Sequence, residues 1–389
     1  MNQYHYALVG HCKMASGLEL GSGVFRYDPA TGDMTHLGNF DRELHVGAQT
    51  YDPRHNRVYG VDEFRNLPGQ TGGGGRVASA SLDYPSGRLT RTSLKRTYAT
   101  NPSYVTVDKT GRYLLVSHHC TDNAVTRMVK TEEGYETQVF HDLCTLLLYR
   151  LEENGDIGPI VDVFEVHGRE EPGGHRFPHL HCVVPDPEGN FYIVCDKGLD
   201  KLYCFRIDYA KEKIVKCWES DGKPGSKPRY CSFHPTKPIF FSNCESSTDV
   251  NTYALDSQTG AFHLIASCAS VGPEVSADIS PSDIVVHPNG RFVYTSLRRQ
   301  NLISVLEALE DGTLIRRQTL SCGGINPRGL CVAPDGRFLL CANMESARVN
   351  RFAIGDDGLL TPAGQVETGG FPGNLQILAV PAGDTCPAE

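Results

Sequence analysis

The sequence predicts an all-β protein, a seven-bladed β-propeller built from four-stranded antiparallel blades. The first observation behind this prediction is a repeated phrase of alternating apolar residues, a Pro/Asn/Asp-Gly turn and a second apolar stretch. It is clearest at residues 101–116, 280–294 and 326–340, and each copy reads as a β-hairpin. The second observation is another phrase that alternates with the first: a strand, an Asp/Glu-rich turn with Gly, and a strand led by Leu or Ile.

Each phrase occurs seven times. The first phrase starts near residues 48, 102, 179, 228, 281, 327 and 372, and the second near 24, 77, 145, 201, 250, 302 and 349. A repeat of roughly 50 residues determines the architecture before any other feature is considered. Seven pairs of hairpins therefore predict seven blades. A β-sandwich, the competing all-β fold, offers no reason to repeat the phrases seven times.

The two ends of the chain are expected to complete one blade together. The N-terminal part supplies a strand at residues 6–10 and a second phrase at 23–38, but no first phrase. The tail at residues 371–380 supplies only a strand. Strands from both ends would thus share a blade and close the ring, so residues 1–389 are predicted to form a single domain.

Two stretches interrupt the repeat. Residues 65–75 contain four consecutive glycines and predict a flexible loop. Residues 118–145 insert about thirty residues within one blade. Long loops on a rigid scaffold often shape a site, and a surface excursion without a function is the alternative.

Composition excludes several classes of function. A formal net charge of −9 argues against a nucleic-acid-binding surface, which is typically basic. No stretch approaches the ~18 apolar residues of a membrane span, and the N-terminus lacks the basic and apolar regions of a signal peptide. The 14 cysteines include no Cys-x-x-Cys, and five of them lie in apolar strand patterns: Cys195, Cys204, Cys231, Cys331 and Cys341. They read as buried thiols of a reducing compartment, which predicts a cytoplasmic protein.

In a propeller, two positions per blade face the same mouth of the central channel. The first lies six residues before the turn proline or its equivalent, and its occupants are Gly47, Ser103, His181, Arg229, Ser282 and Arg328. The second lies at the end of the next strand, and its occupants are Phe64, His119, Lys197, Glu245, Arg298 and Met344. Five charged or imidazole side chains among these come from three consecutive blades and should converge. Such a cluster in one cleft is typical of a functional site, whereas an inert buried ion pair is the structural alternative.

Three nearby histidines offer an alternative interpretation, a metal site. His179 and His181 share one face of a strand, and His175 lies close to them in sequence, so together they could bind zinc. The neighbouring groups at the same mouth are mostly cationic, which disfavours a divalent ion. The glycines at 72–75 are not followed by Lys-Ser/Thr, so a phosphate-binding P-loop is not expected. The sequence therefore predicts neither a metal nor another cofactor.

A known family matches these motifs over nearly the whole chain. Residues 228–235, 243–245, 283–298 and 326–329 resemble those of the seven-bladed propeller lactonases, bacterial propeller-type 6-phosphogluconolactonase and fungal 3-carboxy-cis,cis-muconate cyclase. The resemblance implies a catalytic site formed by the residues at four positions of this chain: His181, Arg229, Glu245 and Arg298. The insertion at 118–145, the Gly-rich loop and the additional histidines depart from that pattern and leave the substrate open.

The expected activity is hydrolysis of a small anionic sugar lactone. Arg229 and Arg298 would hold a carboxylate or phosphate and stabilise the oxyanion, while His181 or Glu245 would activate water as the general base. Further substrate contacts are expected from Lys197, Arg328, His119 and His179. Two alternatives remain open, a cycloisomerase of the carboxymuconate cyclase type and a binding propeller without chemistry. The sequence leaves the oligomeric state undetermined.

Overall fold

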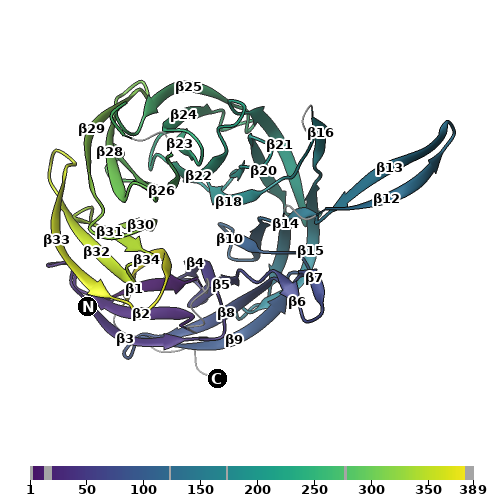
Figure 1. Cartoon of the computed structure of the whole chain (residues 1–389). Helices are drawn as coiled ribbons and strands as arrows, with labels where there is room; N and C mark the ends of the chain where they lie inside the picture. The colour runs from purple at the N-terminus through teal and green to yellow at the C-terminus, as the bar shows by residue number, and fades with distance from the viewer. Residues whose placement is uncertain (1–2, 13–19, 122–123, 172–173, 276–277, 382–389) are drawn as a thin grey trace.

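The computed structural model describes residues 3–12, 20–121, 124–171, 174–275 and 278–381, and these form a closed ring of sheets (Figure 1). Seven of the sheets have four antiparallel strands each, and the described residues contain no helix. The predicted all-β, seven-bladed propeller is therefore confirmed. No helix in this part of the chain is long and apolar enough to cross a membrane.

The blades follow one another in chain order. The first four are β3-β2-β1-β34, β4-β5-β8-β9, β10-β11-β14-β15 and β18 to β21. Their strands are β1 (Gln3–His11), β2 (Ser22–Tyr27), β3 (Met34–Phe40), β34 (Pro372–Pro381); β4 (Val46–Asp52), β5 (Arg57–Asp62), β8 (Arg76–Asp83), β9 (Arg88–Arg96); β10 (Pro102–Val107), β11 (Tyr113–His118), β14 (Cys144–Leu151), β15 (Ile157–Val166); β18 (Leu180–Pro185), β19 (Tyr192–Asp196), β20 (Lys201–Asp208) and β21 (Lys213–Asp221).

Three further blades use four consecutive strands each. Their strands are β22 (Pro228–Phe233), β23 (Ile239–Cys244), β24 (Asp249–Leu255), β25 (Phe262–Ala269); β26 (Pro281–Val286), β27 (Phe292–Leu297), β28 (Leu302–Ala308), β29 (Leu314–Ser321); β30 (Pro327–Val332), β31 (Phe338–Asn343), β32 (Arg348–Ile354) and β33 (Leu360–Glu367). The innermost strands begin within two residues of the predicted starts, because the proline or apolar residue that opens each phrase also opens the strand.

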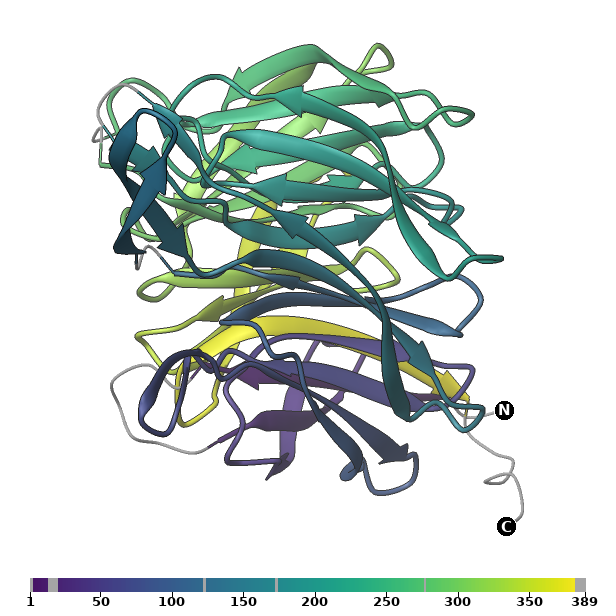
Figure 2. The same cartoon turned by 90° about the vertical axis from the view of Figure 1, so that its right-hand side faces the viewer.

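The ends of the chain close the ring as predicted. β34 is the innermost strand of the first blade and pairs antiparallel with β1, from Gln3 opposite Pro381 to His11 opposite Pro372. β34 also packs against the innermost strands on both sides, β4 and β30. The start of β1 and the end of β34 lie on the side of the ring away from the β12–β13 hairpin (Figure 2).

Both interruptions of the repeat form hairpins. The insertion contains β12 (Ala124–Thr131) and β13 (Gly134–His141), which pair only with each other and project from the ring (Figure 1). The Gly-rich segment, predicted as a flexible loop, contains the paired strands β6 (Asn66–Leu67) and β7 (Gln70–Gly73). Its glycines adopt positive φ angles at Gly69, Gly72 and Gly73, which allows the tight reversal. A third small hairpin, β16 (Arg169–Glu171) and β17 (Gly174–Arg176), precedes β18.

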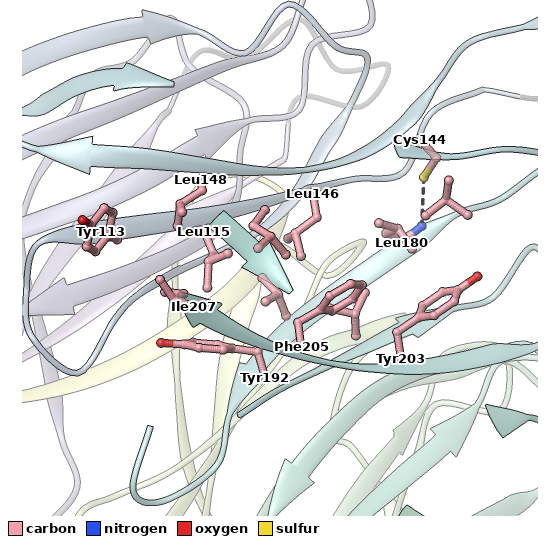
Figure 3. Close-up of a cluster of buried hydrophobic side chains, with 14 of the residues drawn as sticks. Tyr113, Leu115, Cys144, Leu146, Leu148, Leu180, Tyr192, Tyr203, Phe205 and Ile207 are labelled. Atoms are coloured by element: carbon pink, nitrogen blue, oxygen red, sulfur yellow. Dashed lines mark hydrogen bonds between the residues drawn. The ribbon is translucent and has the colours of Figure 1, made fainter. Parts of the chain in front are cut away.

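The hydrophobic core lies between neighbouring blades. Figure 3 shows the cluster between the third and fourth blades, in which Leu146, Leu148, Tyr192 and Phe205 are almost completely buried. Leu180 belongs to this cluster, and its N–H donates a hydrogen bond to Cys144 Sγ at 3.2 Å. The packing thereby fixes the first residue of β18, directly before His181.

Candidate active site

A β-bulge near the start of each innermost strand builds the first half of the site. In all seven blades the register between the innermost and the second strand shifts there, which leaves an extra residue without a register partner. A bulge bends the strand and redirects a side chain. These bulge positions are Gly47, Ser103, His181, Arg229, Ser282, Arg328 and Gly373. Six of them are the first-position residues identified from the sequence.

The residue after the second strand builds the other half. Its backbone N–H bonds to the carbonyl two residues before the bulge, which places it beside the bulge residue. The pairs are Glu63 with His45, His119 with Asn101, Lys197 with His179, Glu245 with Lys227, Arg298 with Ser280, and Met344 with Asn326. In the second blade this residue is Glu63 and not Phe64. The turn there runs from Asp52 to Arg57, so Asn56, and not Arg57, corresponds to the Gly-Arg arginine of the other copies.

These positions surround a cavity of about 590 Å³. Seven of the eight predicted site residues line it: His119, His181, Lys197, Arg229, Glu245, Arg298 and Arg328. The eighth, His179, lines a neighbouring pocket of about 330 Å³. The cavity also includes residues that the sequence did not single out: Cys12, His45, Glu63, Arg65, Asn66 and Asn101.

Glu245 is the centre of a cluster of ion pairs on one wall. Its Oε1 lies 3.0 Å from Lys197 Nζ, and its Oε2 lies 3.0 Å from Arg229 Nε and 3.3 Å from Arg298 Nη2. The three cations come from three consecutive blades, as the alignment of the repeats predicts. Three cations against one carboxylate leave this wall with two net positive charges, so it can attract an anion or an electron-rich carbonyl oxygen.

The two arginines of this cluster are held differently. Arg229 is 1% exposed, and its Nη1 donates to Ser282 O at 2.7 Å and to Ser282 Oγ at 3.1 Å. The side chain of Arg298 is 20% exposed, and its Nη2 donates to Ser280 Oγ at 2.6 Å. Arg229 is therefore a fixed charge in the wall, while Arg298 presents more of its guanidinium to the cavity.

Neighbouring cations keep Glu245 ionised, and burial lowers the pKa of two of those cations, Lys197 and Arg298. Burial alone would raise the pKa of Glu245, but Arg229, Lys197 and Arg298 outweigh it and hold the pKa well below its usual range. Burial, with Arg229 beside it, lowers the pKa of Arg298 to about 10, and burial lowers the pKa of Lys197. Glu245 is thus a permanent anion, and its low pKa makes it a weak base.

His181 lies next to this cluster as a neutral imidazole. Burial, reinforced by Arg229 and Lys197, keeps its pKa well below the ordinary value. Its ring lies 5.0 Å from the Tyr230 ring and 5.4 Å from the His119 ring. The buried Nδ1 has no hydrogen-bond partner among the described residues. A neutral imidazole has one ring nitrogen that can accept a proton.

His119 and His179 form a stacked pair behind His181. Their rings are 4.4 Å apart, and His179 Nδ1 donates to the His119 carbonyl oxygen at 2.5 Å. Burial, followed by Lys197 and His179, keeps the pKa of His119 well below its usual value. His119 can contact a ligand in the cavity, whereas His179 supports its backbone from the neighbouring pocket.

Arg328 and Glu63 lie on another part of the wall. Arg328 Nη2 is 3.6 Å from Glu63 Oε1, a longer contact than any of those around Glu245. Glycines at two bulge positions leave space for the side chains of Glu63, Cys12 and Arg328. A Cβ at Gly47 would lie 2.0 Å from the Glu63 carboxylate, and a Cβ at Gly373 would lie 2.6 Å from Cys12 Sγ and 3.2 Å from Arg328. Aligning the turns on Asp52 and Asp108 would have found Glu63 from the sequence.

The described residues give little support to a histidine metal site. The side chain of His175 lies outside the described residues. Within the described part of the chain, the one group of three potential ligands with mutually close atoms is Cys182, Cys195 and Cys231. All three are buried in the apolar core of the fourth and fifth blades. The cysteines that the structure describes are free thiols.

Comparisons with known proteins agree with this architecture. The 6-phosphogluconolactonase of Bacillus subtilis (strain 168) is 25% identical over 281 residues, which are 72% of this chain and 74% of the relative. The 6-phosphogluconolactonase of Formosa agariphila is 24% identical over 344 residues, 85% of this chain and 87% of the relative. The solved structure of the Pseudomonas aeruginosa periplasmic gluconolactonase superposes with a TM-score of 0.82 at 24% identity and covers 98% of this chain and 100% of the other. The family model described as "Lactonase, 7-bladed beta-propeller" matches residues 6–374, so the chain belongs to the seven-bladed β-propeller lactonase family.

Proposed function

We propose that the protein hydrolyses a small sugar lactone of the gluconolactone or 6-phosphogluconolactone type. The observation that supports this most strongly is the wall of the cavity, where three cations share one carboxylate beside a neutral histidine. The net positive charge of this wall can stabilise the carbonyl oxygen of the lactone, because that oxygen becomes an oxyanion when water adds to the carbonyl carbon. Relatives named 6-phosphogluconolactonase match 72% and 85% of this chain at 25% and 24% identity, which also supports the proposal.

His181 is the general base in this proposal. Its imidazole is neutral, so it can take a proton from a water molecule in the cavity as that water attacks the lactone carbonyl. The proton then passes to the ring oxygen as the acyl–oxygen bond breaks, which yields the hydroxy acid. Glu245 is not assigned this role, because a carboxylate with three cationic neighbours is a poor proton acceptor.

Glu245 positions the cations instead. Its two oxygens connect Lys197, Arg229 and Arg298 and fix the distances between them. Arg298 and Lys197, the two more exposed cations, would bind an anionic substituent of the substrate. The buried Arg229 would stabilise developing charge without leaving its place, because Ser282 and Glu245 hold it.

A proton-release assay with a panel of lactones tests the proposal. Purified protein should accelerate the hydrolysis of glucono-1,5-lactone or its 6-phosphate above the spontaneous rate measured without enzyme. Mass spectrometry of the product in ¹⁸O-labelled water should find the label in the carboxylate, because water attacks the carbonyl carbon. A protein that leaves all aldonolactones at their spontaneous rate, or that isomerises an unsaturated dicarboxylate instead, would contradict the proposal.

A further inference from the structure

The two carboxylates of the cavity differ sharply in their surroundings. Glu245 contacts three cations at 3.0–3.3 Å. The Glu63 carboxylate, in the described part of the chain, has one ion-pair contact, with Arg328 at 3.6 Å, and no hydrogen bond. Burial raises the pKa of Glu63 above its usual value, and Arg328 opposes this rise. In its ionised form a carboxylate offers about four acceptor sites. Glu63 thus faces the cavity with most of its acceptor capacity unused.

The fold leaves space for this carboxylate. At the bulge position, where other blades carry His181, Arg229 or Arg328, the second blade has Gly47. A Cβ at Gly47 would lie 2.0 Å from Glu63 Oε1, so no larger residue can be placed there without moving the glutamate. The side chain of Glu63 is 19% exposed, and its neighbours Asn66 and Asn101 also line the cavity.

We infer that Glu63 accepts hydrogen bonds from hydroxyl groups of the substrate and selects a polyhydroxylated lactone over lactones without hydroxyls or with further carboxylates. This inference rests on the proposed function and specifies its substrate class. Two neighbouring hydroxyls can donate to the two oxygens of one carboxylate, and hydrogen bonds to a charged acceptor are among the stronger ones. A carboxylated ring would instead bring a second anion to Glu63. Arg328 at 3.6 Å partly compensates the charge of Glu63 without using its acceptor sites.

A pair of product analogues tests the inference without depending on turnover. D-Gluconate and 5-hydroxypentanoate both carry a carboxylate, but only gluconate carries additional hydroxyls along the chain. Their dissociation constants are measured by calorimetry or by competition in ligand-observed NMR. The natural protein should bind gluconate at least about tenfold more tightly, since hydrogen bonds to a charged acceptor are stronger than those between neutral groups.

Two variants address Glu63 by different routes. Glu63→Ala removes the acceptor, and Gly47→Ala leaves the carboxylate chemically intact but occupies its space. Both should bring the ratio of the two dissociation constants close to one, and Glu63→Gln, which keeps one acceptor oxygen, should give an intermediate ratio. Glu188→Gln, an exposed glutamate on a turn, is the matched control and should keep the natural ratio. Circular dichroism and thermal unfolding establish that each variant is folded.

The outcomes separate this inference from the proposed function. An unchanged ratio in folded Glu63→Ala, or equal binding of the two acids by the natural protein, overturns the assignment of Glu63. Loss of selectivity in Glu63→Ala together with no lactone hydrolysis by the natural protein supports hydroxyl recognition and contradicts the lactonase activity. If the lactones are hydrolysed but Glu63→Ala keeps the preference, only the inference about Glu63 fails.

Discussion

Neighbouring charges and burial determine the protonation states of the titratable side chains in the cavity. Lys197, Arg229 and Arg298 hold Glu245 as an anion, and burial together with nearby cations keeps His181 neutral. Pairs of titratable groups whose environments push their pKa values apart are typical of acid–base sites. At neutral pH the arrangement therefore holds one fixed anion and one available base.

The pH profile of the reaction follows from His181. The active form has a neutral imidazole, and its pKa lies well below the ordinary value near 6.5. As the pH falls, kcat/KM should therefore stay constant through about 6.5 and decline only at lower pH, where His181 becomes protonated. An acid limb with its midpoint at or above about 6.5 would contradict this assignment. The profile is measured by proton release, corrected for spontaneous hydrolysis.

Arg298→Lys should affect binding more than turnover. Lysine keeps the charge but loses the planar group that contacts both Glu245 and Ser280. KM for a lactone with an anionic substituent is expected to rise about tenfold or more, with a smaller change in kcat. Arg317→Lys, on the outer strand β29, is the control, since Arg317 pairs with Glu307 away from the cavity. A loss confined to kcat would assign Arg298 to the oxyanion instead of the anionic substituent.

A bulge in each innermost strand turns one side chain toward the site. An undisturbed strand pair gives every residue a partner, whereas each innermost strand here carries an extra residue near its start. The strand before and after the bulge stays anchored in the core, as Leu180 shows beside His181. The scaffold thereby orients His181, Arg229 and Arg328 from the strands themselves, while Lys197, Glu245 and Arg298 lie directly after the ends of the second strands.

Leu180→Ala tests how far the core supports the site. Leu180 is fully buried between two blades, so its truncation should cost about 2–5 kcal/mol of unfolding free energy. Urea unfolding followed by fluorescence or circular dichroism measures the change. Leu309→Ala, on a partly exposed leucine, should cost much less. A Leu180→Ala loss below about 1 kcal/mol would mean that this cluster does not anchor β18.

The β12–β13 hairpin should be dispensable for folding. It pairs only with itself, and Thr121 Oγ1 donates to Asp142 Oδ2 at 2.8 Å, so the two ends of the insertion lie close together. Replacing residues 124–140 with a short Gly-Ser linker should change Tm by no more than about 3 °C. A larger loss in differential scanning calorimetry would show that the hairpin stabilises the ring.

The repeated phrases predict the strands, but they predict less well which residue of each repeat lines the cavity. Residues 102, 228, 281, 327 and 372 start strands both in the prediction and in the structure, because a proline or apolar residue marks each start. In the second blade, the sequence alignment of Arg57 with the Gly-Arg arginine predicts Phe64 at the channel, whereas the strand pairing aligns Asn56 instead and places Glu63 there. Cys12 lines the cavity because the ring closes and brings it close to Gly373. This contact joins residues far apart in the sequence, so no local sequence pattern predicts it.

The ring as a whole determines whether the site exists. All seven innermost strands pack side by side, and β34 at the C-terminal end lies between β4 and β30. The cavity receives Cys12, Glu63, His119, His181, Arg229, Arg298 and Arg328 from seven different blades. Closure of the ring therefore brings Cys12, which follows β1, to the same cavity as Arg328 in the seventh blade.

Removal of β34 should abolish the cooperative fold. A chain that ends at residue 368 loses the innermost strand of the first blade and exposes apolar surface around Leu8 and Ala7. We expect loss of a single sharp unfolding transition and binding of a hydrophobic dye. A chain that ends at residue 381 keeps β34 and is the control. Cooperative unfolding of the shorter chain at an unchanged denaturant midpoint would contradict the role of the closure.

The role of His181 as the general base is tested by comparing lactone hydrolysis by the natural protein and by His181→Ala. Proton release at pH 7 is followed with saturating glucono-1,5-lactone or its 6-phosphate, and His263→Ala, an exposed histidine on β25, serves as control. The natural protein and the control should hydrolyse the lactone well above the spontaneous rate, and His181→Ala should lose on the order of a hundredfold in kcat while remaining folded. Near-native turnover of folded His181→Ala would contradict the account and move the search for the base to the other groups of the cavity.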